Sequence, residues 1–307
     1  MGKTAFIFPG QGAQYVGMAK DFYDALPVSR NVFEAASAAS GLNVEELCFT
    51  ENEELNITEY TQTAMLAAEV AILKALEEKG CKPDVTAGLS LGEYAALVAS
   101  GVLTMEDAFK VVRKRGIYMQ KAVPNGGAMV AVLGLDTAVI EEVLAGIEGQ
   151  ISIANYNCPG QIVITGEEAA AAEASEKLKA AGAKRCLTLN VSGPFHSPML
   201  VGAGEKLGEV LDTVEIHDIT VPYLTNVTAD YVTDKSQVKE LLMKQVSSSV
   251  RWQQTIERMI ADGVDTFVEI GPGRTLSGFM KKIDPTKRML HLEKLEELDQ
   301  VVVQLQV

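Results

Sequence analysis

One serine lies in a setting that could make it a nucleophile. Residues 88–92 read GLSLG, a G-x-S-x-G pattern centred on Ser90, between a predicted strand at 84–89 and a predicted helix at 91–100. Small residues around the serine allow a sharp strand-to-helix turn that exposes its hydroxyl. The N–H groups at the start of the helix would face an oxyanion formed beside it. The alternative is that two glycines and a serine merely cap a helix.

A serine hydroxyl needs a base to take its proton, and the sequence offers three histidines. His196 lies in the segment 193–198, GPFHSP, where two prolines stiffen the loop that would present it. His217, in an expected strand at 214–219, and His291, in an expected C-terminal strand, are more typical of structural or solvated positions. No acid flanks His196, so a distant carboxylate or a backbone carbonyl would have to orient its ring.

A glycine loop follows the first predicted strand, residues 4–8. Gly10-Gln11-Gly12 could lend a backbone N–H to an oxyanion, as loops near esterase nucleophiles do, or could be a plain tight turn. A dinucleotide fingerprint would need a third glycine where Tyr15 stands, so nucleotide binding is disfavoured.

A basic run, RKRG at 113–116, lies late in the predicted helix 105–122. It could be a solvated face that suits the negative end of the helix. Alternatively, Arg115 could form a bidentate bond with a substrate carboxylate, a geometry that lysine cannot match.

Composition narrows the class of protein. The chain has 307 residues, of which 47% are hydrophobic and 22% charged, as in ordinary globular proteins. Its net charge of −14 disfavours nucleic acid. The most apolar stretch, 64–76, contains Glu69 and Lys74 and falls short of the roughly 18 residues of a membrane span. The first residues do not form a secretory signal, so we expect a cytoplasmic protein away from membranes. The cysteines and histidines lack metal-ligand spacing, and no metal site is expected.

The order of predicted elements changes near residue 125. Before it, strands alternate with helices, which indicates a parallel sheet covered on both faces. The segment 125–194 reads strand, helix, strand, strand, helix, strand, the ferredoxin-like order. Alternation then returns. The sequence therefore predicts an α/β protein with a discontinuous large domain, residues 1–124 and 195–307, and an inserted ferredoxin-like small domain, residues 125–194.

Six segments taken together resemble one known family. They are FPGQG at 8–12, GLSLGE at 88–93, Arg115-Gly116, 155–160, 194–197 and EIGPG at 269–273. In this order and at these separations they are similar to malonyl-CoA:acyl carrier protein transacylases of bacterial fatty acid synthesis, over essentially the whole chain. That family has a hydrolase-like large domain with an inserted ferredoxin-like domain, which agrees with the element order.

The resemblance implies a ping-pong acyl transfer without a cofactor. Malonyl-CoA would acylate Ser90 while His196 takes its proton, and the phosphopantetheine thiol of acyl carrier protein would then accept the malonyl group. A backbone carbonyl would orient the histidine, and Ser248 falls in the matching segment. The oxyanion would be held by the backbone N–H groups of Gln11 and Leu91.

The resemblance also assigns the substrate pocket. Arg115 would bind the free carboxylate of the malonyl group, and Phe195 would leave little room for a branched acyl chain. The other residues it places at the substrate are Gln62, Asn155 and Asn157. Leu89 departs from the family, which usually has histidine directly before the nucleophile, and Thr63 stands where proline is frequent.

The same resemblance implies the binding partners. We expect a monomer that binds malonyl-CoA and acyl carrier protein. Because carrier proteins are acidic, an acidic enzyme needs a local positive rim. The candidates are Lys110, Lys114, Lys184, Arg185, Lys281 and Lys282. Two other functions remain open: a serine thioesterase, which shares the nucleophile and base, and a non-catalytic scaffold that only docks carrier protein.

Overall fold

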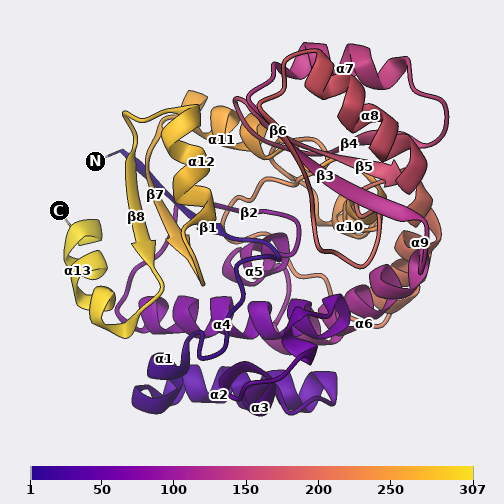
Figure 1. Ribbon diagram of the computed structural model, residues 1–307. Coiled ribbons are helices and arrows are strands. Elements are labelled where there is room, and N and C mark those ends of the chain that lie inside the picture. Colours follow the sequence, from indigo (N-terminus) through magenta and orange to yellow (C-terminus); the bar gives the residue numbers. More distant parts are fainter. Residues whose placement is uncertain (1, 307) are drawn as a thin grey trace.

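The structure, a computed structural model, describes residues 2–306 and contains two separate sheets (Figure 1). The larger domain has a parallel sheet in the order β2-β1-β7-β8. Its strands are β1 (Lys3–Phe8), β2 (Val85–Gly88), β7 (Val264–Ile270) and β8 (Arg288–Leu292). Because β1 and β2 are parallel neighbours, with Phe8 opposite Gly88, the loops that follow them meet at the same edge of the sheet.

Both faces of this sheet are buried. Along β1, Phe6 and Phe8 pack into one hydrophobic cluster, whereas Ala5 and Ile7 pack into another on the opposite face. The first face is covered by α4 (Thr58–Glu78), α5 (Gly92–Ala99) and α6 (Met105–Ala122), with α1 (Lys20–Ala25), α2 (Pro27–Ser40) and α3 (Val44–Phe49) outside them. The second is covered by α11 (Trp252–Ala261) and α12 (Thr275–Ile283). This is the two-sided burial that strand and helix alternation predicts.

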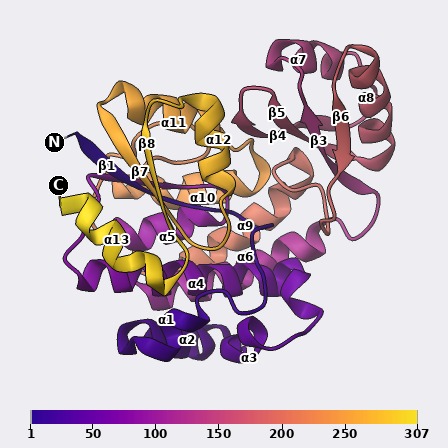
Figure 2. The same cartoon turned by 60° about the vertical axis from the view of Figure 1, so that its left-hand side comes forward.

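The smaller sheet is antiparallel, in the order β4-β5-β3-β6. It consists of β3 (Gly127–Leu133), β4 (Ile151–Cys158), β5 (Gln161–Glu167) and β6 (Arg185–Thr188), with α7 (Thr137–Ala145) and α8 (Glu168–Ala180) packed on one face. Figure 2 shows this unit beside the rest of the molecule. The predicted fold class is confirmed. All four strands lie within 125–194, and the domain limits themselves stay a prediction.

The remaining elements connect these layers. They are the helices α9 (Val201–Leu211), α10 (Val238–Ser247) and α13 (Leu295–Gln306), and the short 3-10 turns η1 (Glu54–Asn56), η2 (Pro198–Leu200) and η3 (Lys235–Gln237). Within residues 2–306, no helix is both long enough and apolar enough to cross a membrane.

Two expected elements differ in the structure. Apolar residues at helical spacing predict a helix over 63–79, and in the structure this helix begins at Thr58. Thr58, Thr61 and Gln62 are polar but buried, so hydropathy does not mark the first turn. Residues 214–219 form no strand. The backbone N–H of His217 donates to Val102, and the segment pairs with no ladder.

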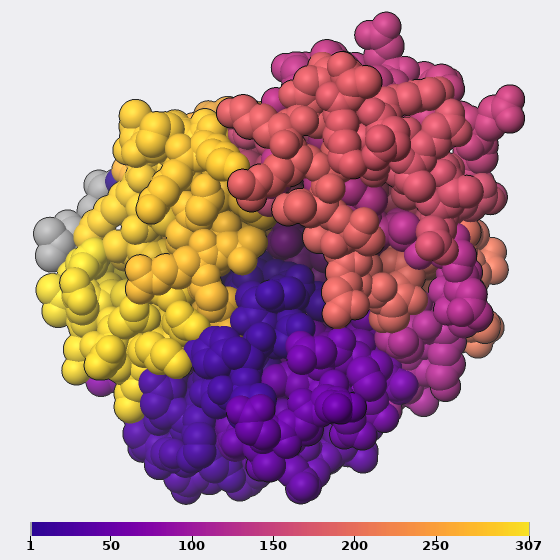
Figure 3. Space-filling model, in the orientation of Figure 1, coloured from indigo at the N-terminus to yellow at the C-terminus, as the bar shows by residue number. Residues whose placement is uncertain are grey.

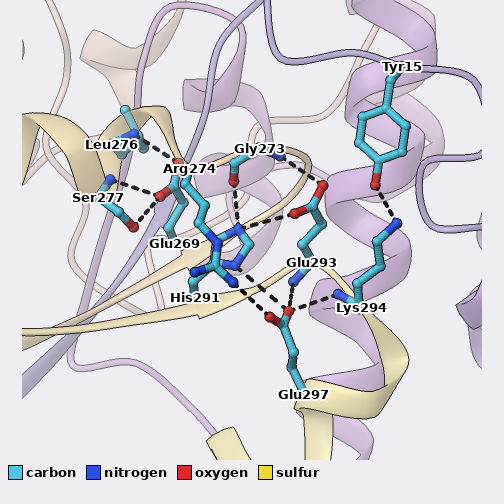
Figure 4. A network of polar contacts seen from close by, with 10 residues as sticks. All are labelled: Tyr15, Glu269, Gly273, Arg274, Leu276, Ser277, His291, Glu293, Lys294 and Glu297. Atoms are coloured by element: carbon cyan, nitrogen blue, oxygen red, sulfur yellow. Dashed lines mark hydrogen bonds and ion pairs between the residues drawn. The ribbon is translucent and has the colours of Figure 1, made fainter.

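A polar network fixes the loop at 271–274, between β7 and α12 (Figure 4). The buried carboxylate of Glu269 accepts two backbone N–H groups at the start of α12. His291 Nε2 lies 2.5 Å from the carbonyl oxygen of Gly273, a bond in which the ring nitrogen must donate. His291 is therefore structural, and the network holds in place a helix whose Thr275 and Phe279 line the cavity described next.

Candidate active site

Ser90 lies in a sharp turn between β2 and α5 that only glycines allow. Ser90 itself has a positive φ of 52°. A Cβ on Gly88 would come within 1.9 Å of the backbone of Gly92, and one on Gly92 would come within 2.3 Å of the Phe8 carbonyl oxygen. Both glycines of the pattern are thus required by close backbone approach, and the strained serine projects from the sheet edge.

His196 meets Ser90 although 106 residues separate them in sequence. Ser90 Oγ lies 2.7 Å from His196 Nε2, and His196 Nδ1 lies 2.8 Å from the carbonyl oxygen of Gln245. Because a carbonyl only accepts, Nδ1 carries the proton and Nε2 is free to accept one from the serine. This arrangement suits a general base.

The carbonyl that orients His196 was expected from Ser248. In the structure the main partner of Nδ1 is Gln245, at the end of α10, and the backbone of Ser248 is a lesser one. The sequence shows which segment approaches the histidine. It does not show which carbonyl of the last helical turn points at the ring.

Burial keeps His196 neutral. The ring is almost fully buried, which disfavours the imidazolium, and the nearby charge of Arg115 adds to the effect. Together they lower the pKa of His196 to about 4. The imidazole is therefore in its base form at neutral pH.

Arg115 turns inward while its neighbours face out. Arg113 pairs with Glu59, and Lys114 is exposed, whereas Arg115 is 1% exposed. Its Nη1 donates to Gln62 Oε1 at 2.7 Å. The solvated-face interpretation of this basic run therefore does not hold for Arg115.

The guanidinium of Arg115 has only neutral acceptors. Nη2 donates to Gln245 Oε1 at 2.9 Å and to Ser90 Oγ at 3.2 Å. Among residues 2–306 it forms no salt bridge, and its Nε has no acceptor. A buried cation without an anion in direct contact is costly, so this site is suited to an anion brought by a ligand.

A cavity of about 180 Å³ joins these groups. It lies between the edge of the parallel sheet and the smaller domain, and Figure 3 shows a hollow where the indigo N-terminal, yellow C-terminal and pink-to-salmon middle parts of the chain meet. The predicted site residues that line it are Ser90, His196, Gln11, Leu91, Arg115, Gln62, Phe195, Asn155 and Asn157. Ser248 does not line it. Leu89 does, as part of the apolar wall.

The two expected oxyanion donors are free. Within the described part of the chain, the backbone N–H groups of Gln11 and Leu91 make no hydrogen bond, and both residues line the cavity. The Gln11 side chain donates to Thr58 Oγ1 at 3.0 Å, which fixes the loop after β1.

Two residues that sequence reasoning missed hold the backbone of Ser90. Asn226 Oδ1 accepts from the Ser90 N–H at 2.6 Å, and its Nδ2 donates to Gly88 at 2.7 Å. Gln245 Nε2 donates to the Ser90 carbonyl at 2.9 Å. No local signal marks either residue, because each lies more than 130 positions from the serine.

Other features of the molecule lie apart from this site. A larger cavity of about 700 Å³, lined by residues such as Lys3, Asp84 and Asp265, is at the opposite edge of the parallel sheet and contains none of these groups. Within residues 2–306 no three His, Cys, Asp or Glu side chains are grouped so as to hold a metal ion.

The chain is similar to known proteins over most of its length. The family described as "Acyl transferase domain" matches residues 5–290. The malonyl CoA-acyl carrier protein transacylase of Bacillus subtilis (strain 168) is 45% identical over 304 residues, covering 97% of this chain and 96% of the relative.

Solved structures are similar over the same extent. The malonyl CoA-acyl carrier protein transacylase of Clostridium perfringens superposes with a TM-score of 0.95 at 45% identity, covering 99% of this chain and 97% of the other. A malonyl-transacylase in complex with its type II polyketide synthase acyl carrier protein has a TM-score of 0.95 at 40% identity, covering 98% and 99%.

Proposed function

The chain belongs to the acyl transferase family, and from that premise we propose that it moves a malonyl group from malonyl-CoA to the phosphopantetheine thiol of an acyl carrier protein. One observation carries the choice of substrate: Arg115 is buried beside the nucleophile, and no acidic side chain within residues 2–306 is in direct contact with it. An acyl group with a free carboxylate, such as malonyl, would place an anion in direct contact with the guanidinium. The relatives named above support the same reaction.

In the first half-reaction, Ser90 Oγ attacks the thioester carbonyl carbon as His196 Nε2 takes its proton. The backbone N–H groups of Gln11 and Leu91 stabilise the oxyanion. The carbon–sulfur bond then breaks, and the CoA sulfur leaves with the proton that His196 returns. The product is a malonyl ester on Ser90.

In the second half-reaction, the carrier thiol attacks that ester. His196 takes the thiol proton and returns it to Ser90 Oγ as the carbon–oxygen bond breaks, so the enzyme is regenerated. Arg115, with Gln62 beside it, binds the malonyl carboxylate throughout. Phe195 limits branching of the acyl chain, and Asn155 and Asn157 line the same cavity.

Intact mass spectrometry after mixing with malonyl-CoA tests the proposal. We expect one malonyl group per chain, mapped by peptide analysis to Ser90, and loss of that group when carrier protein is added. Ser90→Ala should form no adduct. An adduct elsewhere, or none on the wild type, would contradict the proposal.

The two alternatives make different predictions. A thioesterase would release CoA beyond one equivalent in the absence of carrier protein, because water would cleave the ester. A docking scaffold would behave identically after Ser90→Ala. A monomeric, cytoplasmic enzyme without a cofactor is part of our proposal and stays a prediction. The proposal leaves open whether the carrier protein serves fatty acid or polyketide synthesis.

A further inference from the structure

Glu93 is a buried acid that the proposed reaction does not use. It lies in the first turn of α5 and is fully buried. Its Oε2 accepts from Gln245 Nε2 at 2.7 Å and from the backbone N–H of Asn226 at 3.1 Å. No partner within residues 2–306 has hydrogen-bond geometry to its Oε1. A carboxyl group in such a place must interact with a charge or remain protonated.

The side chain of Gln245 lies between Glu93 and Arg115. Its Nε2 donates to Glu93 and to the Ser90 carbonyl, and its Oε1 accepts from Arg115. A reversed amide would set an oxygen against the carboxylate and an NH₂ group against the guanidinium. Glu93 therefore fixes the direction of this amide.

The amide also sets the distance between the two charges. A carboxylate in direct contact with Arg115 would occupy the guanidinium and compete with a ligand. With one amide between them, Glu93 can balance the charge of Arg115 while the guanidinium still lines the cavity.

We infer that Glu93 is the counter-charge of Arg115 in the empty site, and that a substrate carboxylate arriving on Arg115 makes Glu93 take up a proton from solvent. The inference rests on the proposed function. Two negative charges beside one buried cation are unfavourable, so the second carboxylate displaces the charge of the first. Oε1 of Glu93 is the atom available to carry the proton.

The surrounding groups leave Glu93 as the one that titrates near neutral pH. Burial raises the pKa of Glu93 to about 7, against the lowering effect of its hydrogen bonds and of Arg115. Burial also raises the pKa of Tyr94, on the same helix, and of Tyr223, beside β2, and lowers that of His196 to about 4. Arg115, from α6, remains a cation.

The pH dependence of malonyl-CoA binding is the first test. A nearby like charge raises a carboxyl pKa by about one unit or more, so the wild-type KM for malonyl-CoA should rise roughly tenfold between pH 6.5 and 8.5. Glu93→Gln, which cannot ionise, should show a low KM that stays constant. Glu69→Gln removes another fully buried carboxyl, in α4, and should keep the wild-type rise. The inhibition constant of acetyl-CoA, which shares the CoA phosphates but has no free carboxylate, should not rise.

Proton uptake is the second test and needs no variant. Acylation of a serine by a thioester consumes no net proton, so any uptake during loading at pH 7.3 in weak buffer reports on the protein. We expect about half a proton per loaded wild-type chain, from a pKa that starts near 7, and none for Glu93→Gln. A constant wild-type KM, a rise that persists in Glu93→Gln, or loading without uptake would overturn the inference. Absence of a malonyl adduct on wild-type Ser90 would instead contradict the proposed function.

Discussion

Nη2 of Arg115 donates to Oγ of Ser90 over 3.2 Å, so the buried cation and the nucleophile are separated by one hydrogen bond. A malonyl group has a single carbon between its two carbonyl carbons. An acyl group bound to Ser90 therefore brings its distal carboxylate back to the same guanidinium. We therefore expect this direct contact between the two side chains to favour a short diacid as the acyl group.

Arg115→Ala should abolish that selectivity. The variant loses a charged hydrogen-bond partner of the substrate carboxylate, and we expect malonyl transfer to weaken by about 2 to 4 kcal/mol in kcat/KM, with a relative gain for acetyl groups. Steady-state assays with malonyl-CoA and acetyl-CoA measure both changes. An unchanged malonyl preference would remove Arg115 from the proposed carboxylate site.

The pH profile of loading should reflect the environment of His196. Only its neutral form accepts a proton, and that form becomes dominant as the pH rises through about 4 rather than through the ordinary 6.5. As the pH is lowered, kcat/KM should therefore reach half of its maximum near pH 4. Circular dichroism at each pH shows whether the chain stays folded. A half-maximal rate near pH 6.5 in folded protein would contradict the burial argument.

Reversing the charges of Lys281 and Lys282 tests the carrier-docking rim. Both are exposed at the end of α12, the helix whose Phe279 lines the cavity. Changing both to Glu should raise the apparent KM for the acidic carrier protein and leave that for malonyl-CoA unchanged. Lys177→Glu with Lys179→Glu, a matched pair on α8, should leave both constants as they are. Equal effects on both substrates would refute the rim.

Glu69 should limit stability rather than activity. It is fully buried, neither carboxylate oxygen has a partner within residues 2–306, and burial raises its pKa well above the ordinary 4.5. A carboxyl group whose pKa is raised by folding contributes its full stability at a pH below its pKa in the unfolded chain. That contribution is lost as the pH rises through its pKa in the folded protein. Glu69→Met should therefore stabilise the protein by about 1 to 3 kcal/mol at pH 7.5, and by less at pH 4.5. Urea unfolding at both values measures this, and a destabilised variant at pH 7.5 would disprove it.

Local chemistry made the serine turn and the histidine loop predictable. Glycines at 88 and 92 reveal a turn that larger residues cannot enter, and prolines around His196 reveal a rigid loop. Apolar periodicity likewise predicted α6 with the bounds that the structure shows, because one face of that helix is exposed. It missed the start of α4, where the polar residues Thr58, Thr61 and Gln62 are buried.

The sequence by itself determined the types of reactive group and the backbone turns that present them, since both depend on neighbours a few residues apart. Only the tertiary structure decided that Gln245 rather than Ser248 is the main partner of His196, and that Arg115 turns inward toward Ser90. Those choices arise from contacts between segments more than 20 residues apart, which become neighbours only when the parallel sheet and its covering helices pack.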